Sequence, residues 1–409
     1  MMRYSLSRNR MEVLLLENVH PRAVKIFENE HFKITHLKNS IREDELKDVI
    51  AGVHILGIRS RTKISSEVLD NAENLLTVGC FCIGTDQVDL ERCGIQGIPV
   101  FNAPYSNTRS VAELVIAEII MLLRGIAEKN SAAHLGRWLK SAYKSHECRG
   151  KTLGIIGYGH IGSQVSILAE SLGMNVIYYD IVPKLSIGNA SPVSSLNELL
   201  QISDVVTLHV PENDTTRNMI SAEELQLMKR ESYLINTSRG SVVDLEALKT
   251  ALEGGKIAGA AIDVFPEEPK STGDSFDVPL KGFPNVILTP HIGGSTQEAQ
   301  ENIAVDTSKK LIKYIRIGST TGSVNMPQVE VPSIAKGTHR ILHIHRNVPG
   351  VLSSVNAIFS KYSINVAKQY LETSRDIGYV IIDVEGKVTP KVEEELRNID
   401  TTIRTRVVF

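Results

Sequence analysis

The chain has 409 residues, of which 42% are hydrophobic and 22% charged, and its formal net charge is −2. This composition is typical of a globular protein of two or three domains and excludes a fibrous or disordered chain. A charge so near zero gives no basic field for nucleic acid or anionic lipid, so small molecules and copies of the same chain are the expected partners. The four cysteines lack a zinc or haem spacing, which predicts no metal site and reduced, buried thiols in a cytoplasmic protein.

The first hundred residues alternate short apolar runs with helical patterns. The predicted strands are Val13–Leu16, Ile34–Leu37, Ile55–Ile58, Leu75–Val78 and Val100–Phe101. Helices such as Pro21–Asn29, Glu43–Ile50 and Ser66–Asn71 are predicted between them. This alternation predicts a parallel sheet that is covered on both faces. The run before Glu17 is too short for a signal peptide, so we interpret it as a strand.

Two segments of this region place polar groups directly after a predicted strand. Arg59, Ser60 and Arg61 follow the third strand, and two arginines so close together can bind an anion, although solvated surface arginines are also common. In the segment 79–86, Gly84 allows backbone N–H groups to approach a carboxylate. Ligands bind at the carboxyl ends of strands in open α/β sheets, which favours the binding interpretation.

A turn and a helix then lead into a second α/β region. Ser110 is the predicted helix cap, and Leu114–Leu123 is predicted to be a buried helix because it is too short to span a bilayer. Trp138, the single tryptophan, is interpreted either as a core residue or as an anchor for a subunit contact.

Residues 151–180 carry the clearest ligand-binding pattern. Thr152–Ile156 has strand character, and Ser163–Leu172 has apolar residues at helical spacing. Between them stand the glycines of a G-x-G-x-x-G turn, Gly157, Gly159 and Gly162. Such a turn brings backbone N–H groups and the positive end of a helix to a pyrophosphate. Asp180 ends the next predicted strand, where a carboxylate binds an adenosine ribose and favours NAD over NADP.

The βα pattern continues to residue 294, and each further strand ends in polar residues. These are His209, then Thr237, Ser238 and Arg239, then Asp263, and finally His291. Because parallel strands end at one edge of their sheet, we expect these groups to converge on the nicotinamide end of the cofactor.

Arg239, Glu268 and His291 together supply what hydride transfer to a 2-oxo acid requires. Arg239 can bind the carboxylate and polarise the carbonyl, and His291 can transfer the proton. Glu268, bonded to the other imidazole nitrogen, would orient the ring and favour its protonated form. Singly, each residue also fits a structural role, as a surface arginine, a solvated glutamate or a hydrogen-bonded histidine.

Four segments carry a resemblance to a known family: Gly157–Gly162, Asn236–Gly240, Ala261–Pro269 and Thr289–Gly294. They closely resemble the D-isomer-specific 2-hydroxyacid dehydrogenases. On Gly57–Thr62, Gly79–Thr85, Phe101–Val115 and Gly293–Asn302, the chain is most similar to the bacterial-type D-3-phosphoglycerate dehydrogenases within that family.

This resemblance implies two Rossmann-like parallel-sheet domains. A discontinuous substrate domain takes residues 1–104 and 295–330, and an NAD-binding domain takes residues 105–294. The resemblance places Arg239 on the substrate and makes Glu268 and His291 the acid–base pair. The residues implied at NAD are Gly157, Gly159, His160, Ile161, Gly162, Asp180, His209, Thr237, Ser238, Asp263, Gly293 and Gly294. Those implied at the substrate are Lys38, Arg59, Ser60, Arg61, Ile83, Gly84, Asn107 and Lys140, with the cationic side chains at its phosphate. A homotetramer with Trp138 at a subunit contact is also implied.

The C-terminal region has a pattern of its own after a predicted linker at residues 327–338. Strands are predicted at 340–345, 364–371, 379–384 and 402–408, and helices at 351–362 and 390–398. This βαββαβ order is ferredoxin-like. Residues 338–409 resemble an ACT domain, an amino-acid-sensing module, which implies L-serine binding between paired subunits at His345, Asn347 and Asn365.

Three functions are compatible with these features. The first is NAD-dependent oxidation of D-3-phosphoglycerate to 3-phosphohydroxypyruvate, the first step of L-serine synthesis, with inhibition by serine. The second is turnover of another acid, including reduction of 2-oxoglutarate to 2-hydroxyglutarate, because paired arginines also accept a carboxylate. The third is an NAD-sensing binding protein without turnover. RNA binding by the ferredoxin-like sheet is not expected, since exposed aromatics in a basic face are missing.

Overall fold

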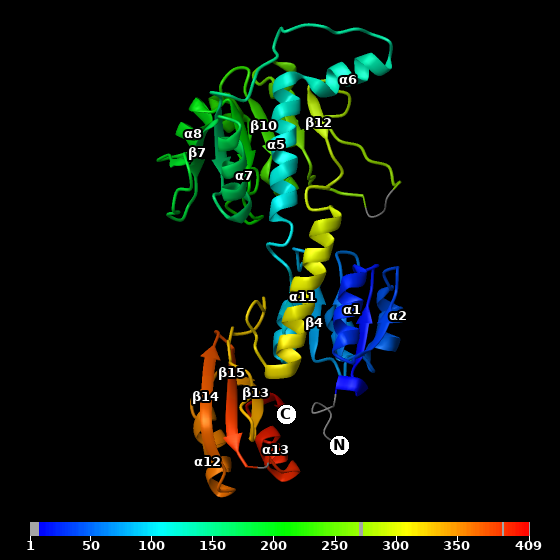
Figure 1. Ribbon diagram of the computed structural model, residues 1–409, viewed down its shortest axis with the longest axis vertical. Coiled ribbons are helices and arrows are strands. Elements are labelled where there is room, and N and C mark those ends of the chain that lie inside the picture. The colour runs from blue at the N-terminus through cyan, green and yellow to red at the C-terminus, as the bar shows by residue number, and fades with distance from the viewer. Residues whose placement is uncertain (1–7, 270–272, 387, 409) are drawn as a thin grey trace. The chain divides into compact units, whose positions relative to one another are not determined.

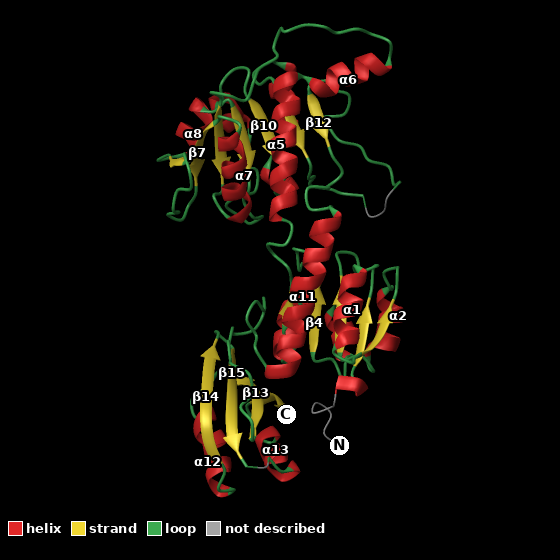
Figure 2. Ribbon diagram, viewed as in Figure 1, coloured by secondary structure: helices red, strands yellow, loops and turns green. Residues whose placement is uncertain are grey.

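The computed structural model describes residues 8–269, 273–386 and 388–408, so the outermost residues of the predicted first and last domains, 1–7 and 409, lie outside it. The chain divides by its contacts into two compact units, Met1–Ser106 with Gln300–Phe409 and Asn107–Ala299. The first unit contains two sheets and the second unit contains one (Figure 2). The three predicted domain boundaries stay a prediction. No helix in the described ranges is long and apolar enough to cross a membrane.

A five-stranded parallel sheet forms the N-terminal part of the first unit, in the order β2-β1-β3-β4-β5. Its strands are β1 (Glu12–Leu15), β2 (Lys33–His36), β3 (Ile55–Ile58), β4 (Thr77–Cys80) and β5 (Val100–Phe101). Helices α1 (Pro21–Asn29) and α11 (Gln297–Ile317) pack on one face through residues such as Phe27 and Leu311. Helices α2 (Glu43–Ile50), α3 (Ser66–Asp70) and α4 (Leu90–Ile95) cover the other face, and a 3₁₀ turn at Arg8–Arg10 precedes β1. The predicted doubly covered parallel sheet is confirmed.

The second unit is built on a seven-stranded parallel sheet in the order β12-β11-β10-β9-β6-β7-β8. Figure 1 labels β7, β10 and β12 of this sheet. The strands are β6 (Thr152–Ile156), β7 (Asn175–Tyr179), β8 (Ser191–Pro192), β9 (Val205–Leu208), β10 (Tyr233–Asn236), β11 (Gly259–Ile262) and β12 (Val286–Leu288). The strand order reverses between β6 and β9. Ligands bind at this switch point in doubly wound sheets.

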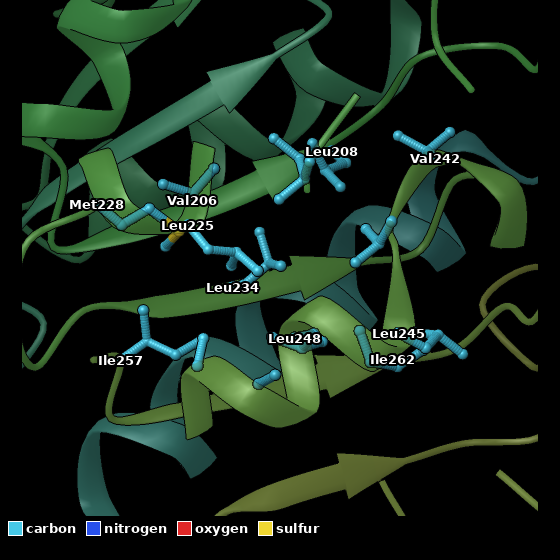
Figure 3. Packing of buried hydrophobic residues seen from close by; sticks show 14 of the residues in the cluster. Val206, Leu208, Leu225, Met228, Leu234, Val242, Leu245, Leu248, Ile257 and Ile262 are labelled. Atoms are coloured by element: carbon cyan, nitrogen blue, oxygen red, sulfur yellow. The ribbon is translucent and has the colours of Figure 1, made fainter. Parts of the chain in front are cut away.

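Helices cover both faces of this sheet as well. The helices are α5 (Thr108–Arg124), α6 (Ile126–His134), α7 (His160–Ser171), α8 (Leu196–Ile202), α9 (Ala222–Leu227) and α10 (Leu245–Glu253), with a 3₁₀ turn at Gly240–Val242. Helices α5 and α7 share one apolar cluster with the sheet. Leu225, Leu234 and Leu248 show how α9 and α10 pack on the other face (Figure 3).

The C-terminal sheet of the first unit is antiparallel, in the order β14-β15-β13-β16, and it confirms the predicted ferredoxin-like fold. Its elements are β13 (Thr338–Arg346), α12 (Val351–Lys361), β14 (Asn365–Thr373), β15 (Ile377–Glu385), α13 (Pro390–Arg397) and β16 (Thr402–Val408). Helices α12 and α13 cover one face. Val329 and Val331 of the predicted linker pack on the other, so this segment is irregular but buried.

Several details differ from the sequence-based predictions. Of the four thiols predicted to be buried, those of Cys82 and Cys148 are only partly buried. Ser110 does not cap a helix, because α5 already begins at Thr108 and the Ser110 hydroxyl hydrogen-bonds to Thr296 Oγ1 at 2.7 Å. The core interpretation of Trp138 is wrong, since the residue is 85% exposed and lies in the irregular segment after α6. Strand β4 lies two residues later than predicted, because Thr77–Cys80 is the segment that pairs with β3.

Candidate active site

The glycine turn between β6 and α7 leaves an opening at the start of the helix. Gly157 has φ +90°, and a Cβ there would lie 2.4 Å from His209 O. A Cβ on Gly162 would lie 2.3 Å from Gly157 O. At Gly159, by contrast, a Cβ would meet no atom within 4 Å, and this residue caps α7 without a side-chain hydrogen bond. Gly157 and Gly162 therefore shape the turn, and Gly159 leaves free space at the positive end of a helix.

Asp180 is positioned at the opposite side of the same turn. Its Oδ2 accepts a hydrogen bond from Tyr158 N at 2.8 Å, and its Oδ1 accepts one from Val182 N at 2.9 Å. His160 and Ile161 form the first turn of α7 beside it, His160 exposed and Ile161 half-buried. The carboxylate is thus fixed beside the glycine turn, and its role at a ribose stays a prediction.

Buried polar atoms lie at the carboxyl ends of β9 and β10. Among the described residues, His209 Nδ1 and Thr237 Oγ1 have no hydrogen-bond partner. Burial lowers the pKa of His209 to about 3, so its ring is neutral, and its Nε2 lies 3.1 Å from Thr207 Oγ1. Ser238 is fixed by Asn236 Oδ1, which accepts from its N–H and from its hydroxyl. A buried polar group without a hydrogen-bond partner is unfavourable. The polar atoms of a bound dinucleotide would supply the missing partners.

Asp263 fixes the loop that carries His291. Its Oδ1 accepts from Thr289 Oγ1 at 2.6 Å and from Ile292 N at 2.8 Å, and its Oδ2 accepts from Gly293 N at 2.8 Å. A Cβ on Gly294 would lie 2.4 Å from Asn107 Nδ2, so Asn107 lies directly beside this loop.

His291 and Glu268 form the hydrogen-bonded pair that the sequence predicts. His291 Nδ1 lies 2.8 Å from Glu268 Oε2 and 3.0 Å from Oε1. The hydrogen bond to Glu268 raises the pKa of His291, although burial opposes this shift. Burial favours a higher pKa for Glu268, but His291, the Phe265 N–H group and the charge of Arg239 outweigh it and lower that pKa. His291 has φ +54°, a conformation that non-glycine residues adopt mainly where the surrounding structure imposes it.

Arg239 lies close to this pair because two loops approach each other closely. A Cβ on Gly240 would lie 2.0 Å from the carbonyl carbon of Phe265, which only a glycine permits. Arg239 is half-buried, and its Nη1 donates to Ser238 O at 2.8 Å. Its charge acts on both His291 and Glu268. The second unit therefore brings the three predicted catalytic residues together.

In the first unit, Glu17 holds the loop of the two predicted phosphate-binding arginines. The buried Glu17 carboxylate accepts hydrogen bonds from the backbone N–H groups of Arg59, Arg61 and Thr62, at 3.2, 3.0 and 2.8 Å. In the described part of the chain, neither guanidinium takes part in an ion pair or a side-chain hydrogen bond. Sequence reasoning missed this role. The sequence does offer one indication of this role, because Glu17 follows strand β1 at the same sheet edge as the arginines.

Other predicted substrate residues lie at the same sheet edge. Lys38 is exposed between Leu37 and Asn39, whose carbonyls accept the N–H groups of residues 18 and 17. Ser60 is exposed in the arginine loop, and Ile83 and Gly84 follow β4, with Ile83 O accepting from Asn102 Nδ2 at 2.6 Å. Lys140 belongs to the second unit and is exposed in the irregular segment after α6.

Comparisons with known proteins identify the family. The NAD-binding domain of the D-isomer-specific 2-hydroxyacid dehydrogenases matches residues 116–293, and an ACT domain like that of the small subunit of AHAS matches residues 341–404. A D-3-phosphoglycerate dehydrogenase of Escherichia coli is 52% identical over 412 residues and 100% of both chains. D-3-phosphoglycerate dehydrogenase 1 of Saccharomyces cerevisiae is 48% identical over 98% of this chain and 88% of its own. The structure of a D-lactate dehydrogenase from Aquifex aeolicus, complexed with NAD and lactic acid, matches with a TM-score of 0.63 and 31% identity, over 74% of this chain and 95% of that one.

The chain belongs to the D-isomer-specific 2-hydroxyacid dehydrogenase family. It is an NAD-dependent dehydrogenase with a C-terminal ACT domain, which favours turnover over the NAD-sensing alternative. The glycine turn, the open position at Gly159 and the fixed Asp180 carboxylate all fit NAD in this dehydrogenase.

The three predicted effector residues of this dehydrogenase do not meet within one chain. His345, at one end of β13, is buried and pairs with Gly378, and Asn347 Nδ2 donates to Ser374 O at 2.9 Å in the nearby hairpin. Asn365 pairs with Glu385 at the other end of β15 and donates to its carboxylate. Seven residues of extended strand separate Gly378 from Glu385, about 23 Å.

Proposed function

We propose that this dehydrogenase oxidises D-3-phosphoglycerate to 3-phosphohydroxypyruvate with NAD, the first step of L-serine synthesis. The observation that carries the substrate assignment is the loop in which Arg59 and Arg61 lie at a strand end, where neither forms an ion pair with any residue that the structure describes. Two such cations suit a phosphate. The names of the full-length relatives from bacteria and yeast support the same substrate.

The catalytic roles follow from the groups at the strand ends. NAD, when bound, accepts the hydride that leaves C2 of the hydroxy acid. His291 Nε2, the ring nitrogen not bonded to Glu268, accepts the proton of the C2 hydroxyl. Arg239 binds the carboxylate and stabilises the charge that develops on the C2 oxygen. Glu268 orients the ring and stabilises the imidazolium that forms.

The raised pKa of His291 sets the pH dependence of each direction. Oxidation requires the neutral ring as a base, so its rate rises as pH increases through that pKa. Reduction requires the protonated ring as an acid, so its rate falls over the same range. Glu268 therefore favours reduction at neutral pH compared with a histidine at its ordinary pKa.

The remaining substrate and cofactor residues keep the roles that the sequence predicts. In the first unit, Lys38 is proposed to assist the arginines at the phosphate, and the backbone of Ile83 and Gly84 to bind the carboxylate end. In the second unit, Lys140 and Asn107 are proposed as substrate residues on the family resemblance. Reduction of 2-oxoglutarate to 2-hydroxyglutarate is proposed as a side activity. The two arginines favour it, because a guanidinium binds a distal carboxylate by the same hydrogen bonds as a phosphate.

Inhibition by L-serine at a site shared by two ACT domains is also proposed. Strand β14 is the edge of its sheet and largely exposed. Two-fold antiparallel pairing of β14 with a second copy places the start of one strand beside the end of the other. Asn365 of one subunit then lies near His345 and Asn347 of its partner, which explains their separation within one chain. We further propose a homotetramer in the cytoplasm.

Steady-state turnover on D-3-phosphoglycerate, phosphohydroxypyruvate and 2-oxoglutarate, with and without L-serine, tests this proposal. We expect preference for the phosphorylated pair, inhibition by serine, and a loss of about 10²–10⁴-fold in kcat for His291→Gln with NAD binding retained. Asn347→Ala should weaken inhibition, whereas Asn398→Ala, at the exposed end of α13, should not. Turnover of only the unphosphorylated acid would contradict the substrate assignment, and full inhibition of Asn347→Ala would move the effector site elsewhere.

A further inference from the structure

Two thiols lie at the strand end that leads into the predicted substrate loop. Cys80 is the last residue of β4 and is fully buried, whereas Cys82 is partly exposed within a bend at residues 81–83. The two side chains influence each other's pKa, and both cysteines are free. In a straight strand, residues two apart have Cα atoms about 6.6 Å apart, near the upper limit for a disulfide. Because the chain bends directly after Cys80, the spacing of a straight strand does not hold the two residues apart.

The Cys82 sulfur is also linked to the arginine loop. Its thiol donates to Gly84 O at 3.2 Å. Gln87 Nε2 donates to the Cys82 sulfur at 3.4 Å and to Arg59 O at 2.6 Å. One side-chain amide thus connects the thiol with the backbone of a predicted phosphate-binding residue. A change at Cys82 acts on both segments that are proposed to hold the substrate.

The surroundings distinguish the two thiols chemically. Interaction with the Cys80 thiol lowers the pKa of Cys82, assisted by Gln87 and the charge of Arg59, although burial opposes the shift. The same interaction and burial raise the pKa of Cys80 well above its ordinary value. Cys82 is therefore the nucleophile, and Cys80 retains its proton.

We propose that Cys82 and Cys80 form a dithiol that peroxide oxidises to a disulfide, and that this disulfide weakens substrate binding. The Cys82 thiolate attacks one oxygen of hydrogen peroxide, the O–O bond breaks, and hydroxide leaves and takes up a proton to become water. The Cys80 sulfur then attacks the sulfur of the resulting sulfenic acid, the S–O bond breaks, and the departing hydroxide takes the Cys80 proton as water. The two cysteines lose two electrons, one peroxide becomes two waters, and a dithiol reductant reverses the change.

The inhibitory effect follows from the lost contacts and rests on the proposed function of the loop. In the disulfide, Cys82 no longer donates to Gly84 O, and its sulfur turns from Gln87 towards Cys80. The segment of Ile83 and Gly84 then loses its connection to the arginine loop. Formation of the disulfide itself does not depend on which substrate the enzyme uses.

Peptide mapping of the full-length protein tests the chemistry separately from activity. Trypsin cleavage after Lys63 and Arg92 releases a peptide of residues 64–92, which contains Cys80 and Cys82 but not Cys93. After titration of the reduced protein with hydrogen peroxide, this peptide should lose two hydrogens. In Cys80→Ser, dimedone should label a sulfenic acid at Cys82.

Kinetics on the same samples test the consequence. The KM for D-3-phosphoglycerate should rise roughly tenfold, the effect of one lost hydrogen bond, while the KM for NAD stays unchanged. Dithiothreitol should restore it. Cys148→Ser is the control, because burial raises the pKa of this thiol and it belongs to the second unit. It should respond to peroxide as the wild type does.

The outcomes that contradict the dithiol, its inhibitory effect and the proposed function can be told apart. A 64–92 peptide that stays reduced at peroxide doses that oxidise Cys148 overturns the proposal. An oxidised peptide with an unchanged KM overturns the inhibitory role. If the reduced enzyme does not turn over D-3-phosphoglycerate, the proposed function fails, and the peptide mass still decides whether the dithiol forms.

Discussion

Glu268 and His291 depend on each other for their charge states. The hydrogen bond between them raises the pKa of the imidazole and contributes to lowering that of the carboxylate. Their contribution to stability is therefore present above the unfolded-state pKa of the glutamate and is lost as pH rises through the raised pKa of the histidine. At lower pH it is lost again, as Glu268 becomes protonated.

Glu268→Gln tests this coupling. Loss of the carboxylate lowers the pKa of His291, so the pH at which oxidation reaches half its maximum should decrease, and the falling limb of reduction should shift in the same direction. The kcat should fall about 10–100-fold, because the imidazolium is less stabilised. The pH profile of kcat/KM in both directions is the measurement, with exposed Glu267→Gln as the control. Unshifted profiles would show that Glu268 does not control the titration of His291.

Glu17 acts as a positioning residue, because it holds the backbone of the arginine loop. Glu17→Gln replaces an acceptor of three N–H groups by an amide with one acceptor oxygen. The KM for the phosphorylated substrate should rise about tenfold with the KM for NAD unchanged, and the free energy of unfolding should fall by about 1–3 kcal/mol. Asp48→Asn, an exposed carboxylate on α2, is the control. A rise in both KM values would indicate general loosening instead.

Among single elements, the β6–α7 turn contains two kinds of glycine. Some are required for the turn to fold, and one leaves space for a ligand. Gly157 and Gly162 are required by the turn itself, because a Cβ at either position would overlap a backbone oxygen. Gly159 is not required by the fold, since it lies in open space with φ −85°.

Gly159→Ala should therefore leave the thermal midpoint of the apo protein nearly unchanged while raising the Kd of NAD at least about tenfold. Gly157→Ala should lower that midpoint, because its φ is positive and its Cβ would lie 2.4 Å from a carbonyl oxygen. Calorimetric titration and thermal melts on both variants give the comparison. Equal NAD affinity in Gly159→Ala and wild type would mean that the cofactor phosphates bind elsewhere.

For the whole molecule, the segment of residues 126–143 is the clearest surface for a subunit contact. It exposes several large apolar side chains within a short stretch: Ile126, Leu135, Trp138, Leu139 and Tyr143. An apolar surface of this kind is typical of an interface.

Trp138→Ala should raise the dissociation constant of the oligomer by roughly 30-fold, the effect of removing a central aromatic anchor of about 2 kcal/mol. Sedimentation velocity over a dilution series measures it. Leu185→Ala, which removes an even more exposed side chain elsewhere in the second unit, should leave the oligomer unchanged. A monomeric wild type, or equal dissociation of both variants, would contradict this assignment.

The order of the elements and the proximity of Arg239, Glu268 and His291 could be predicted from the sequence alone. Period-two and helical patterns, together with glycine turns, are local signals, so the strands, the switch-point turn and the ferredoxin-like fold could be predicted within a few residues. Arg239, Glu268 and His291 were predictable because parallel strands end at one edge of the sheet, and the 2.8 Å contact between Glu268 and His291 agrees with this reasoning.

Contacts between side chains that are distant in the sequence could not be predicted from it, because they depend on the complete fold. Glu17 lies more than 40 positions from the arginine loop, and nothing in its local sequence specifies that its carboxylate accepts three N–H groups there. The exposure of Trp138 and the bonding of Gln87 to both Cys82 and Arg59 are likewise consequences of packing. Burial and hydrogen-bond geometry depend on the whole fold, whereas the periodic patterns depend only on neighbouring residues.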